Sequence, residues 1–296
     1  NASDGKKVIL GDIIAYHNET TVDWIGGFVQ GNYTTDKLNL YGMGGVSSIK
    51  YTYEDHFAAN KDEDGNDIDN FVSAPAINTF QVKGGASYNL DDRLSAFVNT
   101  GYVQKPPILE NVIDYDGNVS QNPDNEKFIS TEIGGEYRSG LVAVKGSYYN
   151  TQWKDRNLTK SVTTGQGSSG DTDIIYLTGV NQSHSGFEIE SKVALNEMVD
   201  VDFIVSIGDW YFDGDAKGDY TEMEYNEEGQ IIGQTSTEYE YALNNLKVGD
   251  MPQTSYVGGL TLKPIDGLRI QGLYKYYDNH YSDWSPDYSE VDGDAD

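Results

Sequence analysis

Carboxylates in this sequence recur at even spacings, which place successive side chains on one face of an extended strand. Two carboxylates held together can act as a general acid and a general base. The alternative, which we favour, is that they meet lysine and arginine side chains across a wet polar interior. The acidic residues are Glu132, Glu136, Glu188, Glu190 and Asp202, and the basic ones are Lys83, Lys145, Lys192 and Arg269.

Familiar catalytic motifs are absent from the sequence. It has no G-x-S-x-G elbow, no H-E-x-x-H pair and no phosphate-binding loop. The histidines are His17, His56, His184 and His280, and no two of them have helical metal-binding spacing, so we expect solvated residues near strand ends. There is no cysteine, which excludes thiolate metal sites and thiol nucleophiles. The sequence therefore contains no recognisable catalytic motif of these kinds.

One acidic segment has the composition of a calcium-binding loop. Asp62, Asp64, Asn66 and Asp67 supply oxygen ligands around the turn residue Gly65. The segment lacks the distal glutamate of a complete EF-hand loop, so a solvated acidic loop is the alternative. Loop-bound calcium is the only cofactor that the sequence suggests.

Aromatic residues beside acidic ones could bind a solute. Aromatic faces stack on sugars and on ligand rings, and they are equally common in the aromatic girdles of membrane proteins. The candidate solute-binding residues, all expected in outer loops, are Tyr115, Trp153, Trp210, Tyr211, Tyr281 and Trp284.

The composition excludes several classes of protein. A net charge of −28, from 48 acidic and 20 basic residues, repels a phosphate backbone and makes nucleic acid a poor partner. It also mildly favours a neutral or cation-bearing solute. An aromatic content of 12% is too high for a disordered chain. No apolar stretch approaches the roughly 20 residues of a membrane helix.

Period-two alternation dominates the chain. Between Phe80 and Leu90 the even positions form an apolar row that is diluted by glycine and alanine, while the odd positions are polar. Similar runs recur up to Tyr276. The pattern predicts an all-β protein, an antiparallel meander of about eleven strands near the length that crosses a bilayer at a tilt.

The connections between these strands alternate between short and long. Short turns are expected near Thr35, Asp91, Ser139, Asn196 and Asp266, whereas long loops are expected at residues 55–76, 106–127, 163–172 and 213–251. Outer-membrane β-barrels have short turns at the periplasmic rim and long loops outside. A secreted sugar-binding β-sandwich also alternates, but it has no reason to segregate its loops by length. The order of loops therefore favours a bacterial outer-membrane β-barrel.

Several stretches, in order, resemble the barrel of TonB-dependent receptors. Lys105-Pro106-Pro107 precedes Asn122-Pro123-Asp124 and then Gly134-Gly135-Glu136-Tyr137, as in the family's mid-barrel signature. The later strands resemble the family at Tyr148–Arg156 and at Ser185-Gly186-Phe187-Glu188-Ile189-Glu190. No plug domain, no TonB-coupling box and no closing aromatic strand is found in the sequence.

The resemblance implies a barrel of about 22 strands filled by a plug. Residues 1–296 would be part of that barrel domain, with the plug and the closing strands absent. Implied partners are outer-membrane lipid, the protein's own plug, the TonB-ExbB-ExbD energising complex and a small-molecule or glycan solute. Glu132, Glu136, Glu188, Glu190 and Arg269 would then face the plug in the lumen.

The function implied is active uptake of a scarce solute such as an iron–siderophore complex. Uptake breaks no bond in the solute, so the resemblance also implies that the protein is not an enzyme. Two alternatives stay open at this point. One is an oligosaccharide-importing receptor of the same family, which works with a surface lipoprotein. The other is a passive porin, which has no plug and conducts ions.

Overall fold

The computed structural model describes residues 7–13, 17–56, 70–113, 117, 119–120, 124–164, 171–225 and 231–285. Within residues 159–176 and 219–239 it describes only the backbone of several strand residues. The described residues form 13 strands and one short 3₁₀-helix, η1 (Leu109–Asn111). None of the helical structure in these ranges could span a bilayer.

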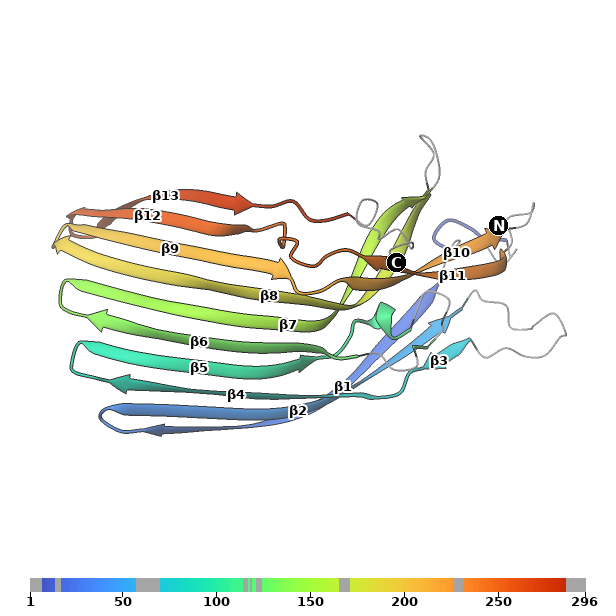
Figure 1. Ribbon diagram of the computed structural model, residues 1–296, viewed down its shortest axis with the longest axis horizontal. Helices are drawn as coiled ribbons and strands as arrows, with labels where there is room; N and C mark the ends of the chain where they lie inside the picture. The colour runs from blue at the N-terminus through green and yellow to red at the C-terminus, as the bar shows by residue number, and fades with distance from the viewer. Residues whose placement is uncertain are drawn as a thin grey trace. The chain divides into compact units, whose positions relative to one another are not determined.

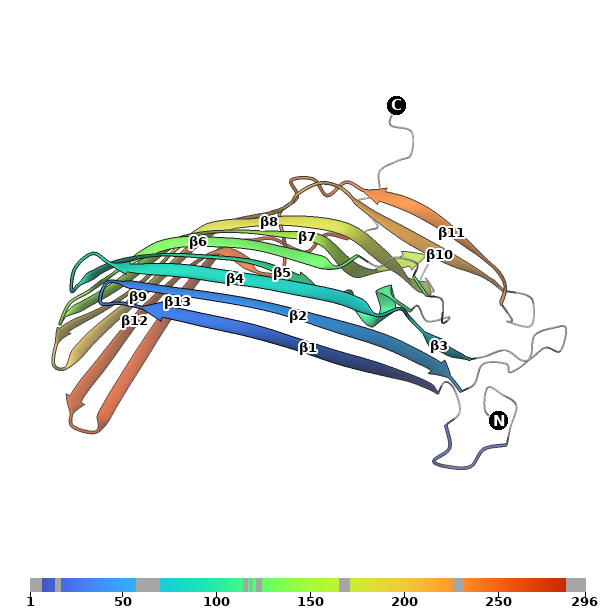
Figure 2. The same ribbon diagram turned by 90° about the horizontal axis from the view of Figure 1, so that it is seen from below.

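Ten strands follow one another as neighbours in a single sheet (Figure 1). This path confirms the predicted antiparallel meander, and Figure 2 shows consecutive strands lying side by side. The ends of the path, β1 and β13, have no described pairing with each other. In order, the strands are β1 (Asn18–Thr34), β2 (Leu38–Asp55), β4 (Ile77–Asn89), β5 (Leu94–Lys105), β6 (Glu126–Arg138), β7 (Val142–Thr164), β8 (Asp171–Asn196), β9 (Val199–Phe212), β12 (Pro252–Ile265) and β13 (Leu268–His280).

All five predicted short turns are present where consecutive strands meet. The gaps lie between β1 and β2, β4 and β5, β6 and β7, β8 and β9, and β12 and β13. Each gap is a few residues long because the strands on either side pair to their ends. The short connections therefore fall at one end of the meander, as the sequence predicted.

The connections at the other end contain more regular structure than the sequence predicted. The expected loop at residues 55–76 contains β3 (Phe71–Ser73), which pairs with β2. The expected loop at 213–251 contains a hairpin of β10 (Ala216–Tyr225) and β11 (Ile231–Tyr241). Polar residues interrupt the apolar–polar alternation of this hairpin. The hairpin is held to the sheet by pairing of β10 with the long β8. The long connection between β9 and β12 is therefore present as predicted, but its hairpin was not predicted.

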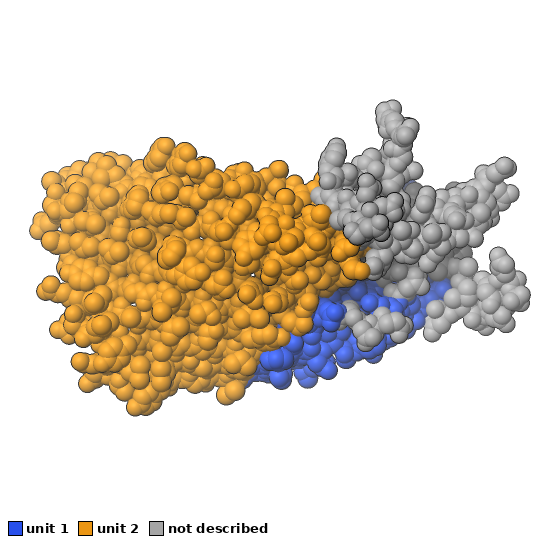
Figure 3. Space-filling model, in the orientation of Figure 1, with its two compact units in different colours: residues 1–28, 45–80, 104–125 blue, residues 29–44, 81–103, 126–296 orange. Residues whose placement is uncertain are grey.

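The chain divides into two compact units, shown in Figure 3. Unit 1 comprises residues 1–28, 45–80 and 104–125, and its core is the cluster Tyr51, Tyr53, Ala74, Val112 and Ile113. Unit 2 comprises residues 29–44, 81–103 and 126–296. Its one described core cluster is Leu177, Val180, Phe212, Ala216, Tyr241, Leu243 and Trp284.

Most large apolar side chains of unit 2 are outside that core. On β8, Phe187 is 60% exposed, Ile189 45% and Leu195 61%. The register continues this row onto neighbouring strands, where Phe187 lies opposite Tyr148 and Ile207, and Ile189 lies opposite Val205. An apolar face that is left exposed along consecutive strands is suited to contact with lipid or with another protein.

The turn between β4 and β5 is held by one carboxylate. Asp91 Oδ1 accepts hydrogen bonds from the backbone N–H of Arg93 at 2.7 Å and of Leu94 at 2.9 Å. These two hydrogen bonds, ahead of the nearby charge of Arg93, lower the pKa of Asp91. The ionised carboxylate thus stabilises the turn.

Because its pKa is lowered in the folded state, Asp91 contributes stability above the ordinary aspartate pKa of about 4, and that contribution is lost as the pH falls below it. We expect Asp91→Ala to reduce the acid sensitivity of unfolding of the full-length protein in that range. Asp92→Ala, at the adjacent turn position, is the control. Denaturant titrations at several pH values measure the effect, and equal pH profiles for the two variants would contradict it.

Candidate functional site

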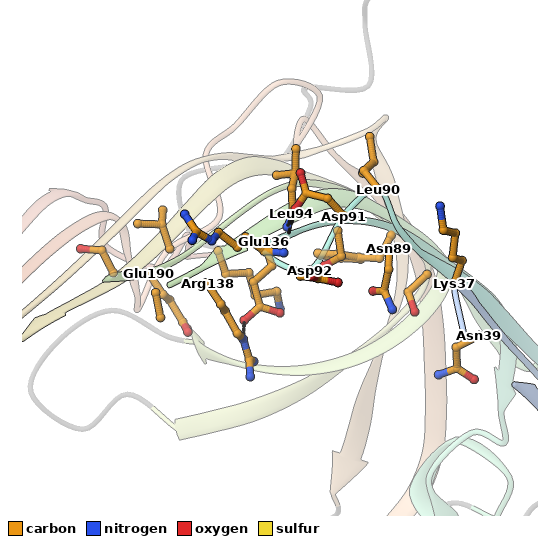
Figure 4. A pocket seen from close by; sticks show the side chains of 18 of the residues that line it. Lys37, Asn39, Asn89, Leu90, Asp91, Asp92, Leu94, Glu136, Arg138 and Glu190 are labelled. Atoms are coloured by element: carbon orange, nitrogen blue, oxygen red, sulfur yellow. Dashed lines mark hydrogen bonds and ion pairs between the residues drawn. The ribbon is translucent and has the colours of Figure 1, made fainter. Parts of the chain in front are cut away.

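The polar face of unit 2 surrounds a hollow of about 1300 Å³ (Figure 4). Its walls come from β2 and from every strand between β4 and β9. Because one hollow is lined by residues of so many neighbouring strands, this face of the sheet is concave. Figure 4 shows Glu136, Arg138 and Glu190 along its wall.

Opposite charges face each other across the strands of this wall. Lys145 on β7 lies opposite Glu136 on β6 and Glu190 on β8. Lys192 on β8 lies opposite Asp202 on β9. Cross-strand pairs of opposite charge stabilise a sheet, whereas like charges would destabilise it. We call these five residues, together with Glu132 and Arg138, the charged ladder.

Side-chain contacts within the charged ladder agree with this register. Lys145 Nζ is 3.9 Å from Glu132 Oε1, and Asn99 donates to Glu132 Oε2 at 3.2 Å. Arg138 forms an ion pair with Glu136 on the same strand. Glu132, Glu136 and Glu190 therefore have basic neighbours on this wall, which favours the charge-pairing interpretation over the acid–base one.

Two further predicted lumen residues follow the same strand alternation. Glu188 lies between Ser147 and Ser206 in the register, on the face of the charged ladder. Ile270 lies opposite Leu262, which shares a face of β12 with Tyr256, the partner of Val205 in the apolar row. Arg269 is next to Ile270 and is therefore on the polar face of β13. Contact of these residues with a plug stays a prediction.

Aromatic and polar side chains form a second, continuous group on the same face of β6 to β9. Trp153 contacts Phe128 with ring centroids 4.4 Å apart, and the Arg156 guanidinium lies 3.9 Å over the Trp153 ring. The Trp153 indole N–H donates to Glu126 at 2.9 Å. Glu126 is 1% exposed, so its carboxylate fixes the Trp153 ring from within the protein.

Gln182 connects this group to β9. Its Oε1 accepts a hydrogen bond from Arg156 at 3.1 Å and lies 3.2 Å from His184 Nε2. The His184 ring lies 5.5 Å from the Trp210 ring, and the Trp210 indole N–H donates to the Tyr149 hydroxyl at 2.9 Å. We call the group the aromatic row; its members are Phe128, Tyr149, Trp153, Arg156, Gln182, His184 and Trp210.

Among the predicted solute-binding aromatics that the structure describes, Trp153 and Trp210 belong to the aromatic row. Their predicted place in outer loops was wrong: Trp153 lies on β7, and Trp210 and Tyr211 lie on β9. Tyr211 follows Trp210 on β9 and therefore points to the opposite face, where Lys247 lies 5.8 Å from its ring. Tyr281 is 37% exposed after the end of β13. Trp284 is only 8% exposed and packs in the core of unit 2.

Other predicted residues lie outside the described part of the chain. These are Tyr115 and the calcium candidates Asp62, Asp64, Asn66 and Asp67. Among the described residues, no three histidine or acidic side chains are already assembled into a metal-binding group.

Sequence reasoning missed most of the aromatic row. Phe128, Tyr149 and His184 are separated by tens of residues, and only the register places them beside Trp153 and Trp210. The sequence did contain one signal, namely that each of these three residues occupies the same alternate positions as the polar residues of its strand. Each lies on the polar side of its alternating strand, where an aromatic ring is out of place in a purely ionic wall.

Comparison with known proteins gives the family. The model described as TonB dependent receptor-like, β-barrel, matches residues 3–295. The chain belongs to this family. TonB-dependent receptors are bacterial outer-membrane β-barrels, so the exposed apolar row of this protein faces the lipid of that membrane. The family and the structural neighbours are transporters and receptors, not enzymes.

A solved structure agrees in fold, and a second is similar. The copper transporter OprC aligns with a TM-score of 0.50 at 12% identity, over 86% of this chain and 42% of its own. The ferric yersiniabactin uptake receptor FyuA of Yersinia pestis aligns at 14% identity and a TM-score of 0.48, over 86% and 40%. The present chain thus spans less than half of either protein. No curated protein sequence matches it.

Proposed function

We propose that this chain is the solute-binding wall of an active outer-membrane importer, energised through TonB-ExbB-ExbD, whose cargo is a scarce solute such as an iron–siderophore complex. The observation that carries the proposal is the aromatic row beside the charged ladder on one face of unit 2. Rings held by hydrogen bonds offer flat surfaces to a ligand with little loss of entropy. The ladder offers the polar surface that a plug requires.

The test is uptake by the full-length protein in cells that lack another receptor for the probe. The probes are ferric hydroxamate and ferric catecholate siderophores carrying radioactive iron. We expect Trp153→Ala and Trp210→Ala each to raise the half-saturating concentration about tenfold, equivalent to about 1.4 kcal/mol of binding. Tyr211→Ala, on the opposite face, is the matched control.

Surface abundance of each variant separates weakened binding from failure to fold. If Tyr211→Ala impairs uptake as much as Trp210→Ala, the aromatic row is not the binding surface. If neither probe is imported by the unaltered protein, the cargo is of another class.

The second candidate cargo is an oligosaccharide. Aromatic faces stack on sugar rings, and the net charge of −28 disfavours an anionic chelate at the mouth. Binding of neutral glycans by the same full-length protein, together with a neighbouring gene for a surface lipoprotein, would favour this cargo over iron.

A passive porin is distinguished by conductance. We expect the full-length protein to leave planar lipid bilayers nearly non-conducting, because a plug resting on the charged ladder blocks the lumen. Steady ohmic conductance in the unaltered protein would identify an open pore and overturn the proposal of gated uptake.

A further inference from the structure

One extra residue interrupts the pairing of β7 with β8 beside the aromatic row. The register advances from Trp153 opposite Gln182 to Arg156 opposite Val180, which is three residues along β7 and two along β8. On an uninterrupted strand, side chains three residues apart point to opposite faces. The extra residue therefore turns Arg156 to the face of Trp153, where its guanidinium lies 3.9 Å from the centre of that ring.

Asp155 is the residue that forms this bulge. Its φ is 54°, in the left-handed region, where aspartate and asparagine are the commonest residues after glycine. Two contacts hold it there. Its backbone N–H donates to Asn181 Oδ1 at 3.1 Å, and its carboxylate forms an ion pair with Lys127. A strained backbone persists only where its surroundings fix it, and such positions cluster at ligand-binding sites.

A second bulge restores the register. From Arg156 to Leu158 the pairing advances two residues on β7 and three on β8, where Gly179 has a φ of 69°. The altered register is thus confined to the few residues around Arg156. Beyond it, Leu158 packs against the core cluster of unit 2, so the rest of β7 is anchored.

Arg156 has donors that the described protein does not use. A guanidinium has five N–H donors, and one of them, on Nη1, donates to Gln182 at 3.1 Å. Glu126 and Asp283 act on its charge, but Glu126 accepts from the Trp153 indole and Asp283 pairs with Lys160. Within the described ranges, no acidic side chain forms an ion pair with Arg156. Its remaining donors are available to a solute.

We propose that Asp155 is a positioning residue of the aromatic row and that Arg156, held by it over Trp153, selects solutes that carry a free carboxylate. This inference rests on the solute-binding role proposed above for the row. A guanidinium binds a carboxylate through two parallel N–H···O hydrogen bonds, and stacking on an indole face leaves its edge free to form them. Arg156 thus gives the row a local attraction for an acid in a chain of net charge −28.

The experiment compares a ferric hydroxamate siderophore that bears one free carboxylate with its methyl ester. Quenching of tryptophan fluorescence measures the binding of each compound to the full-length protein in detergent. We expect the unaltered protein to bind the acid about 10-fold more tightly than the ester, because the charge-assisted hydrogen bonds are lost in the ester. Arg156→Ala should bind both compounds alike.

Two variants of Asp155 separate backbone conformation from charge, because both remove the carboxylate. Asp155→Val should lose the preference for the acid, since a β-branched residue is a genuine outlier in the left-handed region. Asp155→Gly adopts that region freely and should keep the preference. Lys154→Ala, at the adjacent position that points to the opposite face of β7, is the matched control and should keep it too.

The readout is the ratio of the two affinities, because a variant that only loosens the core around Leu158 weakens both compounds alike. Equal loss of the preference in Asp155→Gly and Asp155→Val overturns the positioning role. Equal binding of acid and ester by the unaltered protein overturns the selection by Arg156. The proposed function stands in that case if Trp210→Ala weakens both compounds.

Binding of neither compound to the unaltered protein contradicts a siderophore cargo, and simpler probes then decide on Arg156. Benzoate and benzamide present the same ring with and without a carboxylate. A preference for benzoate that Arg156→Ala and Asp155→Val remove, and that Asp155→Gly keeps, supports the inference. Equal binding of benzoate and benzamide overturns it.

Discussion

Replacing Ile189 with arginine should destabilise the membrane-embedded protein by up to about 2–4 kcal/mol, the cost that an arginine on the lipid face reaches at the bilayer midplane. Ile189 lies within the apolar row of β8, opposite Val205 on β9, and its side chain is 45% exposed on this face. In lipid, an arginine there has no water and no acidic partner. The measurement is an equilibrium denaturant titration of the full-length protein in phospholipid vesicles.

Ile204→Arg on the adjacent strand is the matched control. Ile204 is 40% exposed, but it lies opposite Glu190 and lines the polar hollow. An arginine there adds a base beside an acid in a wet environment, so we expect a change of less than about 1 kcal/mol. Equal destabilisation by the two variants would contradict the assignment of faces.

Trp284→Ala should also have a large effect, a loss of local stability in the core cluster of unit 2. Trp284 lies 6.4 Å from Phe212 and 5.8 Å from Tyr241 between ring centroids, and Lys160 Nζ lies 5.0 Å from its ring. Removal of a buried tryptophan costs about 3–5 kcal/mol. We expect the chain after β13, and the β10–β11 hairpin that packs in the same cluster, to lose protection.

Hydrogen exchange of the full-length protein measures this loss. Tyr281→Ala, in the same segment but 37% exposed, is the control and should leave protection of β10 and β11 unchanged. If Trp284→Ala instead weakens solute binding while protection stays intact, Trp284 is a ligand residue, as the sequence suggested. The structure supports the packing role because the ring is covered by protein.

The contrast between Trp284 and Trp210 shows that aromatic residue type alone does not identify a solute-binding side chain. Both are aromatic residues near acids at the loop ends of strands. Trp210 belongs to the row that runs through His184 and Tyr149, whereas Trp284 fills a core that β8, β9 and β11 build together. Burial depends on which distant strands come together, and composition does not contain that information.

The histidines show which part of a prediction depends on register. The sequence predicted solvated residues near strand ends, and His17 and His56 are exposed just outside β1 and β2, but their proximity was not predicted. His17 and His56 are 39 positions apart yet adjacent, because pairing of β1 with β2 makes them neighbours across the hairpin. Cross-strand proximity follows from register, which a motif of fixed spacing along the chain does not describe.

The sequence alone determined the meander, its short turns and the separation of an apolar face from a charged one, since strand alternation and turn chemistry act over a few neighbouring residues. Only the tertiary structure decided the order of charges in the ladder, the membership of the aromatic row, the β10–β11 hairpin and the meeting of His17 with His56. The physical reason is that a shift of one residue in register moves every side chain to the other face, and pairing along the whole sheet sets the register.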